Sequence, residues 1–247
     1  MTSRTPIPDW QLPPGVDRGL WDYLHSNEMV GGYDAHMALS PLAAADISYC
    51  ETHFPTPGSL VDLGCGTGRL TQHFARRGFR CLGVDLSEEM LTAARANPVP
   101  NAEYLQANLV DLAPLPDATF DYAACLFSTL GMIRGADNRT AALQSAHRVL
   151  IPCGYLVLHV HNRRFYPIAF RTLRSGDIAM SQAYGGAKLS LYHFTRHEAI
   201  SLLKRTGFDV QNVSPIGVRS TSGLSQPWLL PRLRAYGYLI AARKRTA

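Results

Sequence analysis

The chain has 247 residues, of which 46% are hydrophobic and 17% charged, so it is neither disordered nor too short to bury a core without disulfides or metal ions. The length suits one domain with insertions. The net charge of +5 is split, because residues 1–150 carry 10 Arg and Lys against 16 Asp and Glu, whereas residues 151–247 carry 14 against 3. Because the two parts of the chain have opposite net charge, we expect them to have different roles.

No run of eighteen apolar residues is present, which predicts no membrane span. The Pro-rich, polar start from Met1 to Pro14 lacks the apolar stretch of a signal peptide, and we expect it to be a loose arm. The five cysteines are scattered without a C-x-x-C pair, which is typical of reduced thiols. We therefore expect a cytoplasmic protein with neither a disulfide framework nor a metal site.

Residues 20–54 have a helical pattern, in which Ser40 and Pro41 are typical of a helix start. The segment 55–58, Pro-Thr-Pro-Gly, ends that pattern. We expect residues 1–54 to form an arm and covering helices, and residues 55–247 to form the main domain.

Strand and helix patterns alternate from residue 59 onward. The expected strands span residues 59–63, 80–84, 102–106, 120–127, 154–160, 208–213 and 236–242. The expected helices, counted with their caps, span residues 69–77, 87–96, 138–150 and 195–207.

This alternation predicts an α/β fold, with a Rossmann-like, seven-stranded, mainly parallel sheet and helices on both faces. The last strand is expected to be antiparallel, because its connection from Val213 has no clear helix. Ligands of such folds bind beyond the carboxyl ends of the strands. Two long basic insertions, residues 162–194 and 214–235, are expected to form the side of the site that holds the second reactant.

A glycine-rich turn follows the first strand, in the segment Asp62-Leu63-Gly64-Cys65-Gly66-Thr67-Gly68. Its glycines permit a tight turn and a close approach of ligand to main chain. It is not a Walker loop, since no Gly-Lys-Ser/Thr follows, and its third glycine comes one residue too early for G-x-G-x-x-G. Asp85 ends the next strand, where a carboxylate can accept two hydrogen bonds from a ribose diol.

Together these residues resemble the class I S-adenosylmethionine-dependent methyltransferases, over about residues 55–213 and the closing strand. Further matching segments are Gln106–Leu109, Phe120–Ala123 and Arg148–Val157. The resemblance implies an enzyme with S-adenosylmethionine as cofactor. The protein would then contribute placement of the reactants and, for some acceptors, a base.

The resemblance also implies roles for individual residues. The amides of the turn would line the methionine part, Asp62 would orient the turn and hold the methionine ammonium, and Asp85 would bind the ribose. Asn108, where many relatives have Asp, would meet the adenine amino group. The other expected cofactor residues are Cys65 in the turn, Leu86, Leu109, and Leu126 and Phe127 beneath the sulfonium. Cys153 stands where relatives have glycine, so we expect a turn there without positive φ.

His159 and His161 lie at the carboxyl end of the fifth strand and point to the same side, so either could act as a base. The alternative is that they satisfy core or loop hydrogen bonds. Tyr192 and His193 could close over the site or pack the insertion onto the sheet. Tyr33 is either a lid residue or a packing residue.

Arginines of the basic part, beginning with Arg163 and Arg164, could bind an anionic acceptor, lie on a membrane surface or simply be solvated. We expect methyl transfer to a small-molecule acceptor, with an anionic one favoured. The alternatives are an RNA (tRNA-type) methyltransferase and a non-catalytic S-adenosylmethionine-binding protein. The oligomeric state is not predicted.

Overall fold

A computed structural model of the chain describes residues 7–26, 32, 40–166, 177–180, 189–218, 224–225 and 230–246. Its strands are β1 (Ser59–Leu63), β2 (Arg80–Asp85), β3 (Ala102–Gln106), β4 (Phe120–Cys125), β5 (Leu150–His161), β6 (Asp177–Met180), β7 (Leu189–Tyr192), β8 (Phe208–Val218), β9 (Leu224–Ser225) and β10 (Gly237–Lys244). Its helices are η1 (Asp9–Gln11), α1 (Arg18–Leu24), α3 (Pro41–His53), α4 (Arg69–Ala75), α5 (Glu88–Arg95), α6 (Thr129–Met132), α7 (Ala136–Val149), α9 (Arg196–Arg205) and α10 (Pro231–Arg234).

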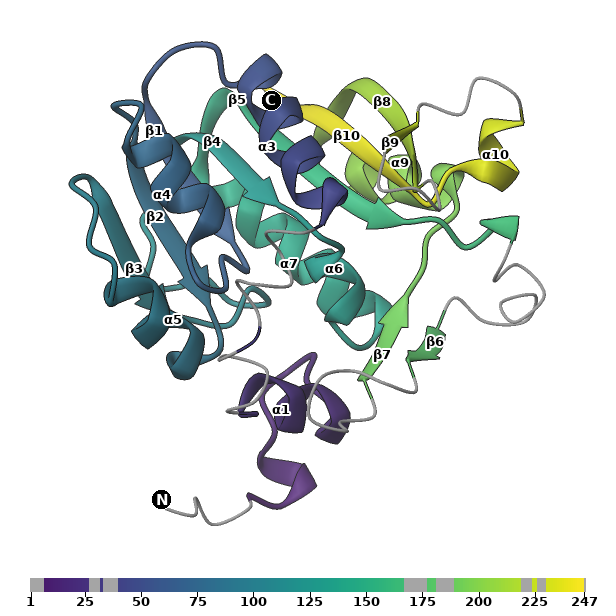
Figure 1. The fold of residues 1–247 in the computed structure, drawn as a ribbon, viewed down its shortest axis with the longest axis horizontal. Coiled ribbons are helices and arrows are strands. Elements are labelled where there is room, and N and C mark those ends of the chain that lie inside the picture. The colour runs from purple at the N-terminus through teal and green to yellow at the C-terminus, as the bar shows by residue number, and fades with distance from the viewer. Residues whose placement is uncertain are drawn as a thin grey trace.

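The main sheet has the order β3-β2-β1-β4-β5-β10-β8-β9 (Figure 1). Strands β1 to β5 pair in parallel, whereas β10 is antiparallel to both β5 and β8. The expected seven-stranded sheet with an antiparallel last strand is confirmed, and the two-residue β9 extends its edge.

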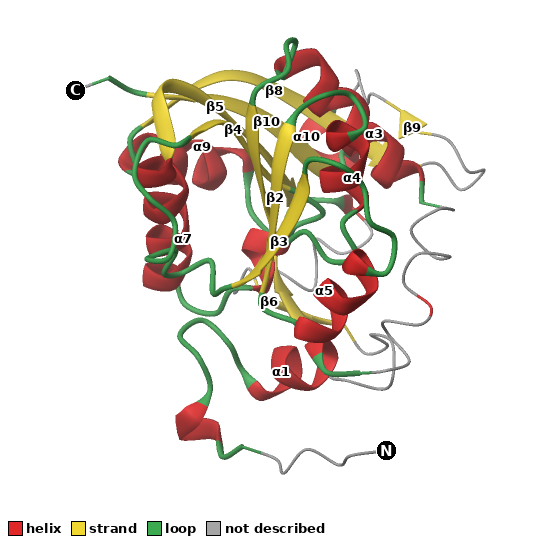
Figure 2. Cartoon of the chain, turned by 90° about the vertical axis from the view of Figure 1, so that its left-hand side faces the viewer, coloured by secondary structure: helices red, strands yellow, loops and turns green. Residues whose placement is uncertain are grey.

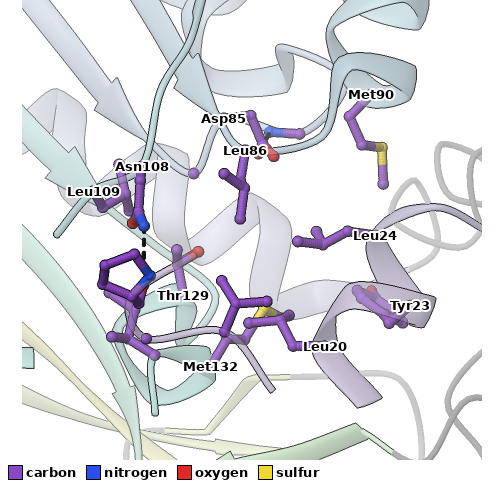
Figure 3. Close-up of a pocket in the computed structure, with 16 residues that line it drawn as sticks. Leu20, Tyr23, Leu24, Asp85, Leu86, Met90, Asn108, Leu109, Thr129 and Met132 are labelled. Carbon is purple, nitrogen blue, oxygen red and sulfur yellow. Dashed lines mark hydrogen bonds between the residues drawn. The ribbon is translucent and has the colours of Figure 1, made fainter. Parts of the chain in front are cut away.

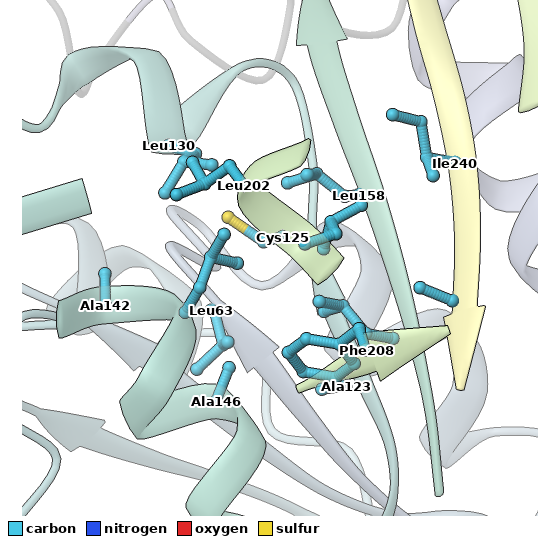
Figure 4. Packing of buried hydrophobic residues seen from close by; sticks show 14 of the residues in the cluster. Leu63, Ala123, Cys125, Leu130, Ala142, Ala146, Leu158, Leu202, Phe208 and Ile240 are labelled. Atoms are coloured by element: carbon cyan, nitrogen blue, oxygen red, sulfur yellow. The ribbon is translucent and has the colours of Figure 1, made fainter. Parts of the chain in front are cut away.

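Helices cover both faces of the sheet, which Figure 2 shows edge-on, with α7 and α9 on one side and α3, α4 and α5 on the other. Ala142 and Ala146 of α7 and Leu202 of α9 pack against one face (Figure 4). Cys50 and Phe54 of α3 and Leu70 and Phe74 of α4 pack against the other. Every residue of β1 is buried, because both faces of this central strand are covered.

The N-terminal expectation is partly wrong. Residues 7–14 are not a loose arm, because Asp9–Gln11 form η1 and Pro14 lines a pocket described below. Asp9 is held there by an ion pair of 2.6 Å with Arg18. The predicted helical region contains α1 and α3; of the residues between positions 26 and 40, the structure describes only Gly32, which is helical.

The expectation for Cys153 is also wrong, since its φ is +65°. The pairing of β4 with β5 shifts there, from Phe120 opposite Leu150 to Tyr122 opposite Tyr155. A Cβ on Gly154 would lie 3.0 Å from two backbone oxygens, so position 154 has no room for a side chain. The neighbouring Cys153 therefore adopts the left-handed backbone conformation of this irregular pairing.

The basic insertions have structure of their own. Residues 177–180 and 189–192 pair as the hairpin β6–β7, and Asn162 bridges to Phe194. The second insertion contains β9 and the short helix α10. Within the described part of the chain, no helix is both long and apolar enough to cross a bilayer.

Candidate active site

A pocket with about 720 Å³ of empty space, part of it open to solvent, lies at the carboxyl ends of β1 and β2 under α1 (Figure 3). Its lining residues are Pro14, Gly15, Val16, Leu20, Tyr23, Leu24, Gly64, Gly66, Asp85, Leu86, Met90, Asn108, Leu109, Thr129, Met132 and Ile133. Six of the residues expected for the cofactor are among them: Gly64, Gly66, Asp85, Leu86, Asn108 and Leu109.

The glycine-rich turn forms the floor of this pocket. Gly64 has a φ of +81°, and a Cβ there would lie 2.4 Å from the Thr129 methyl group. Gly68 has a φ of +83°, and a Cβ there would lie 2.4 Å from the Tyr104 hydroxyl oxygen. Only glycine fits these places, and the resulting turn brings main chain up to the pocket.

The Asp85 carboxylate connects the turn to the next helix. Its Oδ2 accepts a hydrogen bond of 2.8 Å from the Gly66 amide, and its Oδ1 accepts one of 2.9 Å from the Ser87 amide. Burial raises the pKa of Asp85, and these backbone hydrogen bonds partly oppose the rise. Since a carboxylate can accept about four hydrogen bonds, Asp85 can still accept from a ligand.

Asp62 lies beside the pocket, outside its lining. Its Oδ2 accepts hydrogen bonds from the Thr71 amide (3.2 Å) and hydroxyl (2.8 Å), which ties β1 to α4. Burial raises the pKa of Asp62 to about 6. Four other expected cofactor residues, Cys65, Gly68, Leu126 and Phe127, also lie outside the lining, and Tyr33 lies outside the described residues.

Asn108 joins the pocket to the N-terminal segment. Its Nδ2 donates a hydrogen bond of 2.9 Å to the Pro14 carbonyl, and its Oδ1 accepts one of 3.0 Å from the Val110 amide. Sequence reasoning missed this N-terminal wall. A signal was present, since Asp17 precedes Arg18–Leu24 as a helix cap and accepts a hydrogen bond of 2.8 Å from the Leu20 amide.

A cluster of buried histidines lies at the carboxyl end of β5. The rings of His159 and His161 are 5.6 Å apart, as expected for one side of a strand, and the rings of His161 and His193 are 5.3 Å apart. His159 Nδ1 lies 2.7 Å from Oδ1 of Asp46, and both side chains are fully buried. Asp46 was also missed, although an acid after the apolar stretch Leu42–Ala45 was a signal.

The ring nitrogens of His159 and His161 differ in their hydrogen bonds. Because a carboxylate only accepts, His159 Nδ1 donates the hydrogen bond to Asp46, and this contact orients the ring and leaves Nε2 outside it. Neither His159 Nε2 nor either ring nitrogen of His161 has a hydrogen-bond partner among the described residues. Burial, with the neighbouring His159 and His193, holds the pKa of His161 well below its usual value.

Tyr192 packs the hairpin β6–β7 onto the domain. Its hydroxyl accepts a hydrogen bond of 2.6 Å from Arg163, and the Arg139 guanidinium lies 3.9 Å from its ring centre. His193 is buried, with Nδ1 3.1 Å from the Leu191 carbonyl oxygen. These contacts favour the packing interpretation of Tyr192 and leave His193 beside the histidine cluster.

The pocket therefore combines a glycine turn, an acid with free acceptor positions and an apolar wall. Residues 61–158 match a family model described as a methyltransferase domain. The chain contains a class I S-adenosylmethionine-dependent methyltransferase domain. The pocket fits the cofactor of this family, because Gly64 and Gly66 bring main chain to its wall and the Asp85 carboxylate beside them offers acceptors to a diol.

Similar proteins include other methyltransferases. The chain is 30% identical over 174 residues to malonyl-[acyl-carrier protein] O-methyltransferase of Pseudescherichia vulneris, covering 70% of this chain and 62% of that protein. It is 30% identical over 139 residues to dTDP-3-amino-3,6-dideoxy-alpha-D-glucopyranose N,N-dimethyltransferase of Streptomyces fradiae, covering 56% and 51%. The matched parts thus span between half and two thirds of these relatives.

A solved structure shows the same fold over nearly the whole chain. The 1,6-didemethyltoxoflavin-N1-methyltransferase of Burkholderia thailandensis, with its acceptor and S-adenosylhomocysteine bound, superposes with a TM-score of 0.64. The superposition covers 95% of this chain and 93% of that one, at 20% identity. At this identity the likeness concerns the fold of the methyltransferase domain.

Proposed function

We propose that this protein transfers the methyl group of S-adenosylmethionine to a small-molecule acceptor. The observation that carries the proposal is Asp85, whose buried carboxylate holds the glycine turn, lines the pocket and can still accept from a ligand. Relatives named for a dTDP sugar and for 1,6-didemethyltoxoflavin support an acceptor of small size.

When bound, S-adenosylmethionine supplies an electrophilic methyl group on a positively charged sulfur. In this proposal Gly64 and Gly66 bring main chain to the methionine part, and Asp85 binds the ribose hydroxyls. Asn108 keeps one acceptor position on Oδ1 for the adenine amino group. The apolar wall from α1, with Leu20, excludes water.

Asp62 and Phe127, which we also predict from the sequence, lie outside the pocket lining and support the turns beside it. Asp62 fixes β1 against the start of α4, and so holds the turn between them in one conformation. Phe127 and Ser128, which follow β4, both have positive φ, of 51° and 62°. This sharp turn ends β4 beside His159, whose carbonyl accepts a hydrogen bond of 3.2 Å from the Ser128 amide.

We assign the base to His159 rather than to His161. Asp46 holds the Nδ1 proton of His159, so Nε2 can take the proton that a hydroxyl or amine acceptor loses. His161 has no such orienting partner among the described residues. It stays neutral beside His159, because its burial lowers its pKa.

Calorimetry with S-adenosylhomocysteine tests the cofactor site. Asp85→Ala should weaken binding at least about a hundredfold, since it removes two hydrogen bonds to a charged acceptor. Glu103→Ala, an exposed acid on β3, is the control and should bind like the wild type. Equal affinity of the Asp85 variant would remove the ribose assignment.

A labelled-methyl assay against fractionated metabolites and total RNA tests the reaction. Label in a metabolite fraction supports the proposal. Label in RNA that falls steeply with added salt would replace it with the RNA alternative. Tight cofactor binding without label in either pool would indicate the non-catalytic alternative.

A further inference from the structure

A second cavity lies at the carboxyl end of β5, on the α9 face of the sheet. It has about 1110 Å³ of empty space, part of it open to solvent, and shares no lining residue with the pocket under α1. Arg164, Arg196 and Arg232 line it around Tyr238. These four residues define what we call the arginine pocket; α10, which carries Arg232, lies at the right of Figure 1, away from α1 at the bottom.

No acid among the described residues pairs with Arg164, Arg196 or Arg232. None of them has an ion pair or a side-chain hydrogen bond within the part of the chain that the structure describes. The acid that lines the same cavity, Glu198, is already paired with Arg163 at 2.7 Å and accepts from the Thr195 amide at 2.7 Å. The cavity therefore carries an excess of positive charge.

Buried contacts hold the backbone of this pocket in place. Asn162 is fully buried, and its Nδ2 donates to the carbonyls of Arg232 (3.0 Å) and Ala235 (2.8 Å). Its Oδ1 accepts a hydrogen bond of 3.0 Å from the Arg164 amide. One amide group thus ties together two of the arginine-bearing segments, and the capping box of Thr195 and Glu198 fixes the third.

Tyr238 lines the arginine pocket together with the three arginines. Its ring is 3% exposed and belongs to the core. Burial raises the pKa of Tyr238, and the positive charges of these arginines oppose that rise. A ligand there would meet a hydroxyl donor below and guanidinium groups around it.

We propose that the arginine pocket binds a phosphoryl or diphosphate group carried by the methyl acceptor. Guanidinium groups present paired donors that match phosphate oxygens, and several of them around a concave site suit more than one negative charge. Arg164 follows His159, the proposed base, by five positions, so these two positions are at most about 18 Å apart along an extended chain. This inference rests on the proposed function, and it adds the chemical class of the acceptor.

Calorimetry with inorganic pyrophosphate at constant ionic strength tests the pocket. Wild type should bind it, and the triple variant Arg164→Gln, Arg196→Gln, Arg232→Gln should bind at least tenfold more weakly. Arg205→Gln, at the far end of the same helix as Arg196, is the matched control and should bind like the wild type. Tyr238→Phe keeps the ring in the core and should bind about threefold more weakly, for the loss of one donor.

Titration of the same samples with S-adenosylhomocysteine separates this inference from the proposed function. The triple variant should keep wild-type affinity for it. No pyrophosphate binding by a wild type that binds S-adenosylhomocysteine would overturn the inference and leave the proposed function standing. Failure to bind S-adenosylhomocysteine would instead count against the proposed function.

Two further experiments show whether the bound phosphoryl group belongs to the methyl acceptor or to RNA. Alkaline phosphatase treatment of the active metabolite fraction should reduce labelled-methyl transfer at least tenfold; undiminished transfer would overturn the assignment to the acceptor. A single-stranded RNA 12-mer should bind no more tightly than pyrophosphate. Tighter RNA binding that the triple variant loses would make this surface an RNA footprint and would also overturn the inference.

Discussion

Asp46 and His159 form a buried acid–histidine pair that joins α3 to β5. Two fully buried polar side chains cost free energy to desolvate, and here a single hydrogen bond of 2.7 Å offsets that cost. Arg69 adds a weaker interaction, 3.9 Å from the other Asp46 oxygen. Such a pair orients the histidine ring, which is the role we give to Asp46.

Asp46→Asn tests this positioning role. The amide can donate as well as accept, so Nδ1 of His159 should lose its fixed proton, and kcat should fall at least about a hundredfold while affinity for S-adenosylhomocysteine stays unchanged. Nitrogen-15 NMR of labelled histidine should show the changed tautomer. Glu51→Gln is the matched control, because Glu51 lies on the same helix and pairs at 2.9 Å with the less buried His73. An unchanged tautomer and kcat in the Asp46 variant would contradict the assignment.

Cys153 is held in a conformation that costs an L-residue about 1–2 kcal/mol. Cys153→Gly should therefore raise the free energy of unfolding by up to about 1 kcal/mol, after the greater freedom of glycine in the unfolded chain is deducted. Urea denaturation measures the change. Asn101→Gly, at a φ of 66°, should gain less, since asparagine tolerates this region. A destabilised Cys153 variant would mean that the thiol makes a compensating contact.

At the scale of elements, the segment before α1 is attached through few bonds. Besides the Asn108 contact, the Arg134 amide donates to the Gly15 carbonyl at 2.8 Å, and the Arg134 side chain pairs with Asp17 at 3.0 Å. A segment held this way can open locally without unfolding of the sheet.

Asn108→Asp should loosen the segment. The variant keeps the acceptor for the Val110 amide but replaces the donor to Pro14 with a second carboxylate oxygen, which would face the carbonyl oxygen. We expect roughly tenfold faster hydrogen exchange in residues 15–18, the equivalent of one lost hydrogen bond. Exchange in β1 should stay unchanged and serves as the internal control. Equal exchange in both proteins would show that the segment is held by its apolar contacts alone.

At the scale of the whole molecule, buried histidines predict an acid-sensitive fold. His161 has a pKa well below its usual value because it is buried next to His159 and His193. The unfolded chain takes up a proton at His161 below about pH 6.5, whereas the folded chain does not, so stability falls as the pH falls. The steepest slope for one proton is about 1.4 kcal/mol per pH unit.

His161→Leu should reduce this loss. Between pH 7 and pH 5 the variant should lose up to about 2 kcal/mol less stability than wild type, measured by urea denaturation. Asp62 titrates in the opposite sense, since its pKa is raised to about 6, but it does so equally in both proteins. His197→Leu, at an exposed position, should follow the wild-type curve. If the unfolding free energies of wild type and the His161 variant fell equally between pH 7 and pH 5, His161 would take up its proton in the folded chain as well.

The acidic and basic parts of the chain line different pockets of the fold. The acidic part contains the glycine turn and Asp85, and every lining residue of the pocket under α1. The basic part contains all three arginines of the arginine pocket. Net charge alone, at +5, carried none of this information.

The sequence by itself determined the chain order of the seven main strands and the helices between them, the glycine turn and Asp85. Each of these depends on neighbours within a few residues, through hydrophobic period, capping or glycine spacing. The antiparallel direction of the last strand followed from the lack of a clear helix in the connection before it. Cys153 marks the limit, because its strained turn follows from pairing with β4.

Only the tertiary structure decided which distant residues meet. Asp46 and His159 are 113 positions apart, and Asn108 reaches Pro14 across 94. The three arginines come from separate segments that Asn162 and a capping box bring together. No local pattern reports such contacts, because the packing of helices and insertions against the sheet creates them.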